Sequence, residues 1–542
     1  MKKNIIIYLA SFMLFFSFSS CEKKIDDAFA NPNASVRVPI ETILPGVIGN
    51  FVGSSAAAGS AYGTANDALY VGRYVQYWGT NSAGNQYDQM GGATGASDIL
   101  GSVWAMHYFG MGENLNKMIK WGIEEEKWDY VGVGYAIRAW SWLTLTNMHG
   151  EVILNEAFRP EQLVFKYNTQ QEVYDSVRSI ARLAISYLDK TGGNVSQSNL
   201  AKGDAYFYNG DVNKWKKFVY SVMARSFNHL SNKTDYKADS VLKYAALGIN
   251  SNDDNATSKF ANTGITGTSN FYGPYRANVG ALRQSQFVAN LMNGLNSRFS
   301  GLPDPRASYM LRENTNGTIR GVLMNKGASG LVAADQPQGF WGQVFSSATS
   351  PTSDAACRYI FKNGAPFPIL TASEVKFMMA EAYLRKGDAN AARTAYLDGI
   401  SLNIDMLTGI YNADVPVAKQ ITSATKTAFL SNPKLAIPAA SLSLSHIMLQ
   451  KYIALYGFGP LETWVDMRRF HYTDADEKAG GQVYADFVPP SGIDLFINNS
   501  SKLTYRARPR YNSEYLYNVA ELTRLGALAL DYNTKEQWFS QK

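Results

Sequence analysis

The chain has 542 residues, of which 46% are hydrophobic and 18% are charged. This is the composition of a folded globular protein, and it excludes a largely disordered chain. The formal net charge is only +6, and the lysines and arginines are scattered along the sequence. A positive charge this small and this dispersed gives no support for a nucleic-acid-binding protein.

The N-terminus has the features of a secretion signal. Lys2 and Lys3 precede an apolar run over residues 5–18, and Ser19 and Ser20 follow it. A charged start, an apolar run and small residues, in this order, are typical of a signal peptide. The run is too short to span a bilayer, which takes about 20 residues, and no later segment is apolar enough to do so. We therefore expect an exported chain without a membrane-spanning helix.

Cys21 follows these small residues directly. Its context, Phe-Ser-Ser-Cys, resembles a bacterial lipobox, in which the signal is cut just before a lipidated cysteine, although Phe18 stands where leucine is usual. Several acyl chains on one terminus give stable membrane attachment. We predict a signal peptide over residues 1–20, lipidation of Cys21 and a tether over residues 21–45. The alternative is simple secretion with Cys21 left as a free thiol.

Helical periodicity begins clearly after the first quarter of the chain. Apolar residues spaced by three and four positions predict helices around Trp140 and around Trp215. Between them, Thr169 and Glu172 have the spacing of a capping box, in which each side chain satisfies a backbone N–H group of the first helical turn. The tryptophans on predicted helical faces are expected in the core, and they are Trp140, Trp142, Trp215 and Trp464.

The clearest helix pair lies within residues 371–400. Thr371 and Glu374 form a second capping-box pattern, and a glycine at position 387 ends the first helix. Small and large residues across the pair match the tetratricopeptide pattern, in which small residues let two helices approach and aromatic rings fill the groove. We predict that Tyr383, Gly387 and Tyr396 are structural, with both tyrosines buried between helices. The full set of matches is Ala380, Tyr383, Gly387, Ala392, Tyr396 and Gly399.

From about residue 250 to 370 the helical periodicity fades, and Gly, Asn, Ser and Thr become frequent. Long irregular segments in a compact protein are usually functional or disordered, and the aromatic residues here argue against disorder. Loops on a rigid scaffold often carry binding residues. We predict a mainly α fold over residues 46–542, in which tetratricopeptide-like helix pairs form a superhelical scaffold and carry a loop-rich ligand-binding region.

Several short motifs occur together in a particular order. Each motif is modest alone, but their order and spacing resemble the SusD/RagB family of nutrient-binding outer-membrane lipoproteins over essentially the whole mature chain. After the lipobox-like start they are WKKF at 215–218, DPR at 304–306, the helix repeat at 374–388, QKY at 450–452, LETWVDMRR at 461–469 and RYNSE at 510–514.

This resemblance implies a binding protein without catalytic activity or cofactor, lipid-anchored on the cell-surface side of the outer membrane. Such proteins sit over a SusC-type TonB-dependent barrel transporter and deliver oligosaccharides, or in some members oligopeptides, into it. The ligand loops differ widely among members, so ligand identity does not carry over. We expect oligosaccharide binding, with oligopeptide binding as the alternative.

Two other classes of function stay open. A glycan-active enzyme would need a cleft with two facing carboxylates about 5–10 Å apart. A pure scaffold that binds only proteins would have a closed surface without an aromatic-lined cavity.

The candidate ligand-binding residues come from the segment before the first long helices and from the irregular region. A flat ring covers the apolar face of a sugar, while amide and guanidinium groups bind its hydroxyls. Relatives that bind glycans use a tryptophan and an asparagine at a similar early position. For the aromatic candidates the alternative is packing in the core. The candidates are Asp67, Arg73, Trp78 and Asn81 in the first segment, and Tyr272, Tyr275, Phe340 and Trp341 in the second.

Other reactive residues fit structural roles better. The five histidines have no ligand-like spacing, so we expect no metal site. Cys357 has no partner for an internal disulfide once Cys21 is lipidated, and we expect it to be buried as a small hydrophobic residue. Residues 304–306 are expected to form a structural turn. Arg468 and Arg469 suit an inter-helix ion pair better than an anion site.

Overall fold

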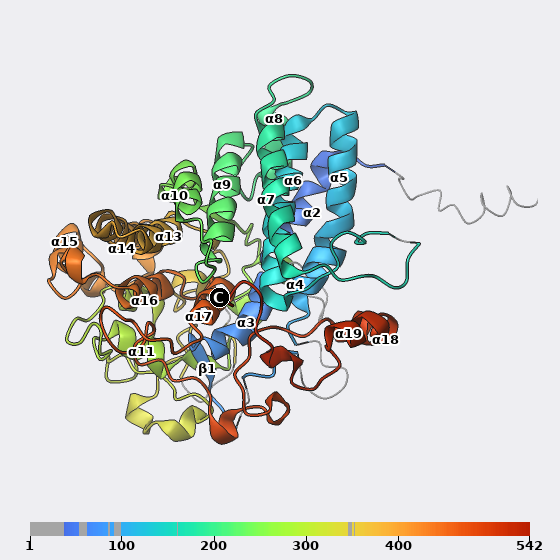
Figure 1. The fold of residues 1–542 in the computed structure, drawn as a ribbon. Coiled ribbons are helices and arrows are strands. Elements are labelled where there is room, and N and C mark those ends of the chain that lie inside the picture. Colours follow the sequence, from blue (N-terminus) through green and yellow to red (C-terminus); the bar gives the residue numbers. More distant parts are fainter. Residues whose placement is uncertain are drawn as a thin grey trace, which may run out of the picture.

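The computed structural model describes residues 37–53, 62–84, 87–91, 99–159, 161–344, 349–351 and 353–542. The predicted signal peptide, Cys21 and most of the predicted tether lie outside these residues. In the part that is described, the fold is mainly α, as predicted (Figure 1). None of the helices described has an apolar stretch that could cross a bilayer.

The longer helices of the N-terminal half form a layer of upright helices in the upper part of Figure 1, and α3 and α4 lie below them. Within it, α6 packs against both α5 and α7, and α9 packs against α7 and α10. Helix α6 is buried on nearly all sides, which explains why its sequence is apolar all round. The helices of this half are α2 (Leu44–Gly49), α3 (Thr64–Tyr74), α4 (Ser102–Ala105), α5 (Glu113–Glu124), α6 (Trp128–His149), α7 (Gln170–Leu188), α8 (Gln197–Asp204), α9 (Val212–Asn228) and α10 (Ala238–Leu247).

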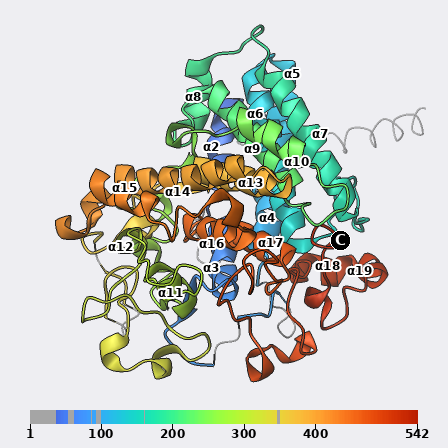
Figure 2. The same cartoon turned by 60° about the vertical axis from the view of Figure 1, so that its left-hand side comes forward.

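The tetratricopeptide-like pair begins a second layer, which crosses below the first in Figure 2. Gly387 ends the first helix at a φ of +84°, a conformation that favours glycine. The Asp388 side chain then accepts the N–H of Ala391 (3.0 Å) and caps the second helix. The helices of this layer are α13 (Ala372–Arg385), α14 (Ala389–Tyr411), α15 (Ser423–Ser431), α16 (Leu444–Ala454) and α17 (Pro460–Arg469).

Two details of this pair differ from the sequence-based prediction. Tyr396 is fully buried, as expected, but Tyr383 is only partly buried. The prediction was wrong for Tyr383 because it lies in the last turn of α13, next to the exposed residues 385–388. Thr371 accepts the N–H of Glu374 (3.3 Å), but the Glu374 carboxylate turns to Arg225. Of the two predicted capping boxes, the one at the start of α7 is therefore complete and the one at the start of α13 is not.

The irregular region contains short elements, as expected, namely α11 (Gln286–Met292), α12 (Ala307–Met310), β2 (Ala256–Ser258), β3 (Leu282–Gln284) and β4 (Phe367–Leu370). Strand β2 pairs antiparallel with β4. Strand β3 pairs antiparallel with β1 (Trp78–Thr80), so that Trp78 lies opposite Gln284. This pairing fixes the irregular region to the segment that follows α3.

After α17, the helices α18 (Tyr511–Tyr517) and α19 (Val519–Leu525) contact the segment before α7, where the Tyr167 hydroxyl donates to Glu514 at 2.7 Å. His471, just after α17, lies between two carboxylates, with Nδ1 2.7 Å from Asp474 and Nε2 3.0 Å from Glu536. The hydrogen bond with Glu536 and the pairing with Asp474 raise the pKa of His471 to about 9. The charged imidazole therefore links the last residues of the chain to the helical layer.

We predict that the protein loses stability as the pH rises from 6.5 to 9. The ordinary pKa of the histidine is 6.5 and the folded one is about 9. The stabilisation is therefore complete below pH 6.5, and it is lost as the pH rises through 9. Urea unfolding at a series of pH values should show this decline in wild type and a smaller one in His471→Gln. Glu536→Gln, which removes one partner, should lie between them. Equal pH slopes in all three proteins would contradict the assignment.

Candidate functional site

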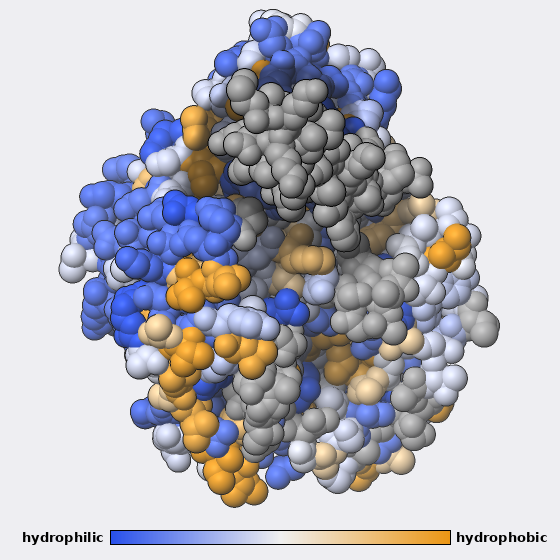
Figure 3. Space-filling model, turned by 90° about the vertical axis from the view of Figure 1, so that its right-hand side faces the viewer, coloured by the Kyte–Doolittle hydropathy of each residue, from blue (hydrophilic) through white to orange (hydrophobic). Residues whose placement is uncertain are grey.

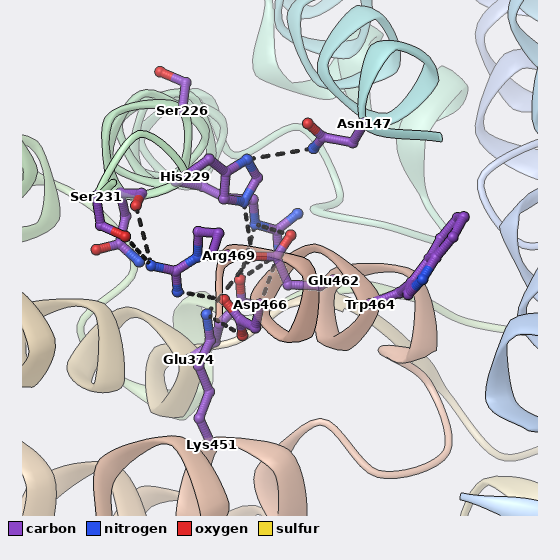
Figure 4. Close-up of polar contacts among 12 residues, drawn as sticks. Asn147, Ser226, His229, Ser231, Glu374, Lys451, Glu462, Trp464, Asp466 and Arg469 are labelled. Carbon is purple, nitrogen blue, oxygen red and sulfur yellow. Dashed lines mark hydrogen bonds and ion pairs between the residues drawn. The ribbon is translucent and has the colours of Figure 1, made fainter. Parts of the chain in front are cut away.

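The densest cluster of buried charge lies where α9, α13, α16 and α17 meet (Figure 4). Arg225 on α9 donates to both oxygens of Glu374 on α13, at 2.8 and 2.7 Å. Arg469 on α17 donates to both oxygens of Glu381, at 2.7 and 2.9 Å, and to Asp466 at 2.6 Å. Each arginine thus ties together elements that are far apart in the sequence.

Glu462 on α17 is a further carboxylate of this cluster. Lys451 on α16 lies 3.6 Å from Glu462 and 2.8 Å from Asp466. Nε2 of His229 lies 2.9 Å from Glu462, and its Nδ1 lies 3.3 Å from the amide nitrogen of Asn147. Burial lowers the pKa of His229 even though Glu462 opposes this, so we treat the imidazole as neutral, donating through Nε2.

The charges in this cluster balance. Buried ionised groups are tolerated only when they are paired and hydrogen-bonded. Arg385, at the edge, donates to Glu381 at 3.0 Å and supplies the fourth positive charge. The carboxylates are Glu374, Glu381, Glu462 and Asp466, and the cations are Arg225, Lys451, Arg469 and Arg385.

Two of these carboxylates have the electrostatics of an acid–base pair. Burial raises the pKa of Glu374 to about 7, whereas His229 and Arg225 hold the pKa of Glu462 well below its usual range in spite of burial. Pairs whose pKa values are pushed apart are typical of glycosidases. However, the cavity beside them has only about 60 Å³, against roughly 300–1,000 Å³ for small-molecule sites. We therefore interpret this cluster as structural.

Arg468 and Arg469, at the end of α17, have different roles. Arg469 makes the expected inter-helix ion pairs. Arg468 instead donates to the carbonyl oxygens of Asn147 (2.8 Å) and Tyr505 (2.9 Å), and its guanidinium lies 3.9 Å from the centre of the Trp464 ring. Neither residue is available to a free anion, because both are fully buried.

The expectations for residues 304–306, for Cys357 and for the helical tryptophans are confirmed. Asp304 and Arg306 form a buried ion pair at 2.6 Å, as expected of a structural turn. Cys357 is buried, and burial raises the pKa of its thiol to about 12. Within the described part of the chain, no group of three or more His, Cys, Asp and Glu side chains is arranged to hold a metal ion. The four tryptophans predicted to lie in the core, Trp140, Trp142, Trp215 and Trp464, are all buried.

Trp78 lies in the core and not at a ligand-accessible surface. Its indole N–H donates to the carbonyl oxygen of Leu69 at 2.8 Å, and its ring packs edge-on against Tyr272 and Phe340. Gly72 on α3 makes room for it, since a Cβ there would lie 2.3 Å from the indole. The ring has no open face for a ligand, so the packing alternative replaces the predicted contact.

The same correction applies to three aromatic candidates in the irregular region. Phe340 stacks on Phe361 with ring centres 4.1 Å apart. The indole N–H of Trp341 donates to the carbonyl oxygen of Tyr272 at 2.8 Å. Tyr272, Phe340 and Trp341 are all buried. These rings form a core for the loops, which is why the segment is ordered although it lacks long helices.

Asp67 also has a structural role. It is buried, and its carboxylate accepts the backbone N–H groups of Ser102 (3.2 Å) and Val103 (2.8 Å) at the start of α4. A carboxylate at this position satisfies N–H groups that have no partner inside the helix. Asp67 therefore positions α4 against α3 and is not exposed to a ligand.

Arg73 lies at an open cavity of about 600 Å³. Its guanidinium lies 5.2 Å from the centre of the Tyr70 ring, one helical turn earlier on α3. The Tyr70 hydroxyl accepts the N–H of Gln89 at 2.8 Å. Across the cavity, the Asn325 amide donates to Asp494 at 3.2 Å. We call this the Arg73 cavity, and its lining residues are Tyr70, Arg73, Gly84, Gln89, Ile99, Asn325, Lys326, Ile493 and Asp494.

The two other candidates, Asn81 and Tyr275, are not among the lining residues of the Arg73 cavity. Asn81 is half-buried and lies three residues before Gly84, a lining residue, and its backbone packs closely on Gly327. Tyr275 is 39% exposed but does not line the Arg73 cavity. Of the eight candidates, only Arg73 thus lines the cavity.

Sequence reasoning missed most of the cavity wall. Tyr70 lies three positions before Arg73, a spacing that places both on one helix face, so the sequence carried a signal for it. Gln89, Asn325 and Asp494 come from three distant segments, and no local pattern marks them. A second cavity of about 230 Å³ shares Asp494 and is lined by further amides, including Gln76, Gln286 and Asn290.

Comparison with known proteins agrees with this fold. The sequence model of the SusD-like family, described as "Starch-binding associating with outer membrane", matches residues 49–491. The sequence matches no curated protein.

Solved structures match over nearly the whole chain. A SusD/RagB family protein from Bacteroides thetaiotaomicron is 20% identical, with a TM-score of 0.65, covering 93% of this chain and 99% of that one. A SusD homologue from Bacteroides uniformis is 19% identical, with a TM-score of 0.65 and the same coverage of both chains. A chitin-binding SusD homologue from Flavobacterium johnsoniae is 15% identical, with a TM-score of 0.64, covering 92% and 98%. At these identities the likeness shows a shared fold.

The charge cluster predicts a large loss of stability when one partner is removed. Arg469→Met leaves Glu381 and Asp466 short of a buried partner, and we expect it to lower the free energy of unfolding by about 3–5 kcal/mol. The double variant Glu381→Leu/Arg469→Met should recover much of this loss, because Asp466 keeps Lys451 and the partly exposed Arg385 is the cation that loses Glu381. Denaturant unfolding measures both, with Arg182→Met on the exposed face of α7 as the control. A loss below about 1 kcal/mol for Arg469→Met would contradict this role.

Proposed function

We propose that this chain, which belongs to the SusD-like family, is a surface lipoprotein of the outer membrane that captures oligosaccharides at the Arg73 cavity. We further propose that it delivers them to a SusC-type TonB-dependent barrel transporter. The observation that carries the proposal is the cavity itself, which combines an open volume of about 600 Å³ with a wall rich in hydrogen-bonding groups. The family description names starch and outer-membrane association, and the Flavobacterium relative is described as chitin-binding.

The wall of the cavity suits sugar hydroxyls. Arg73 and Lys326 can only donate hydrogen bonds, Asp494 accepts them, and the amides of Gln89 and Asn325 do both. A hydroxyl group also donates and accepts, so this mixture can satisfy several hydroxyls at once. Burial lowers the pKa of Arg73, but a guanidinium stays charged in proteins. The wall therefore offers charge-assisted hydrogen bonds to a neutral, polyhydroxylated ligand.

Two further features support an oligomeric ligand. Ile99 and the 93% exposed Ile493 give the cavity an apolar edge that can cover the C–H face of a sugar ring. The neighbouring 230 Å³ cavity shares Asp494 and is lined by further amides, so a ligand longer than one sugar unit would find hydrogen-bonding groups beside the Arg73 cavity. An oligopeptide could use the same amides through its backbone, and it is the alternative outcome of the binding test below.

Exposed apolar side chains support a protein partner, and one of them, Ile493, lines the Arg73 cavity. Figure 3 shows apolar side chains gathered in a band on one face of the molecule. Ile497 is 85% exposed, and its segment contacts the stretch after the exposed Leu530. Large exposed apolar side chains often mark protein interaction sites. With no membrane-spanning helix in the described residues, the proposal assigns transport across the membrane to the partner.

We expect Arg73→Gln to weaken oligosaccharide binding by about 10-fold or more, because it removes a charged hydrogen-bond donor. Calorimetry with panels of starch-type and chitin-type oligosaccharides and of short peptides measures this for wild type and variant. Arg182→Gln, on the exposed surface of α7, is the matched control and should bind like wild type. Unchanged affinity in Arg73→Gln would exclude the Arg73 cavity, and binding of peptides alone would replace the ligand class.

We expect Cys21→Ala to release the protein from the membrane, because the proposal gives Cys21 all of the attachment. Fractionation of cells that express wild type or Cys21→Ala tests this, and retention of the variant in the membrane pellet would contradict it. A pull-down of the wild-type protein from native outer membranes should bring down a TonB-dependent barrel, and its absence would contradict the partner.

A further inference from the structure

Another cavity, of different chemistry, lies between α2, the end of α8 and the strand β2. Figures 1 and 2 both place α2 beside α8, and the two helices are in contact. The cavity has about 410 Å³ and shares no lining residue with the Arg73 cavity or with the 230 Å³ cavity beside it. It is therefore independent of the proposed oligosaccharide site. We call it the Lys259 pocket.

The inner surface of the Lys259 pocket is mainly apolar. Its apolar lining residues include Ile48, Val52, Tyr206 and Phe260. A volume of a few hundred Å³ with an apolar lining and a few polar groups is typical of sites for small molecules. Tyr206 is 51% exposed although it is a large ring, so an occupant would cover apolar surface that is now open to solvent.

The charged groups of the pocket all have the same sign. Lys202, Lys259 and Arg276 line it, and no Asp or Glu is among its lining residues in the described part of the chain. Arg276 is held in place by the carbonyl oxygens of Ser269 (3.3 Å) and Gly53 (3.4 Å). Burial lowers the pKa of Arg276, but the guanidinium stays charged. Three positive charges beside an apolar surface favour an anionic occupant.

The polar groups of the pocket lie at its rim. Lys202 and Lys259 line the pocket and are exposed. Their ammonium groups can therefore bind one end of a ligand, while the apolar walls cover the rest.

From these features we infer that the Lys259 pocket binds a small apolar molecule with a single anionic group, such as a medium-chain carboxylate. The apolar body would lie against Ile48, Val52 and Phe260, and the carboxylate would lie at Lys202 and Lys259. This ligand class differs from the neutral, polyhydroxylated ligand of the Arg73 cavity. The two sites would therefore bind different molecules on one chain.

Decanoate and decanol test the inference, because they share a chain length and differ in charge. Calorimetry on the purified protein should show decanoate binding at least 10-fold more tightly than decanol. The double variant Lys202→Gln/Lys259→Gln should weaken decanoate binding by about 10-fold or more and leave decanol unchanged. Ala205→Trp, which fills the pocket from its exposed edge, should weaken both. Equal binding of decanoate and decanol, or no detectable decanoate binding, would overturn the inference.

The controls separate this site from other effects. Lys117→Gln/Lys120→Gln removes two exposed positive charges from α5 and should bind decanoate like wild type. An equal loss in this control would mean a general charge effect and would overturn the assignment to the pocket. Oligosaccharide binding should be unchanged in Lys202→Gln/Lys259→Gln, so that the outcome at this pocket is independent of the outcome at the Arg73 cavity.

Discussion

Charge neutralisation between helices is the constraint on which the helical scaffold depends. Glu374, Glu381, Glu462 and Asp466 are buried, and each is stable there only because a cation from another part of the chain reaches it. Arg225 and Glu374 are 149 positions apart, and Arg469 and Glu381 are 88 apart. Because these pairs need short, directed hydrogen bonds, they fix how α9, α13 and α17 lie against one another. Apolar packing alone is less directional and would tolerate small shifts between the same helices.

The segment after α3 connects the helical scaffold to the Arg73 cavity. Trp78 packs against Gly72 on α3, and β1 pairs with β3 in the irregular region. Asp67, on the same helix, holds the start of α4. The buried aromatic residues of the early segment and of the loops are thus used to fix the backbone. The side chains left at the open surface of the cavity are mainly amides and charged groups, which bind a ligand through hydrogen bonds.

The Arg73 cavity and the Lys259 pocket show how one scaffold can offer different chemistry at different edges. At the Arg73 cavity, acidic, basic and amide groups alternate, so a neutral polar ligand finds both donors and acceptors. At the Lys259 pocket, positive groups border an apolar surface, so charge and shape favour an amphipathic anion. Both cavities are formed largely by loops and helix ends, where the chain can vary without disturbing the buried ion pairs.

The sequence by itself determined the features that depend on near neighbours in the chain. The helix pair predicted within residues 371–400, the turn at Gly387, the capping box at Thr169 and the burial of the helical tryptophans all follow from local spacing and local hydrogen bonding, although the second helix continues to Tyr411. Only the tertiary structure decided whether an aromatic residue in an irregular segment is buried, as Trp78 is, and which residues meet at the Arg73 cavity. Those outcomes depend on contacts between distant segments, such as those of Arg73, Asn325 and Asp494. The spacing of residues over one helical turn or one strand does not indicate such contacts.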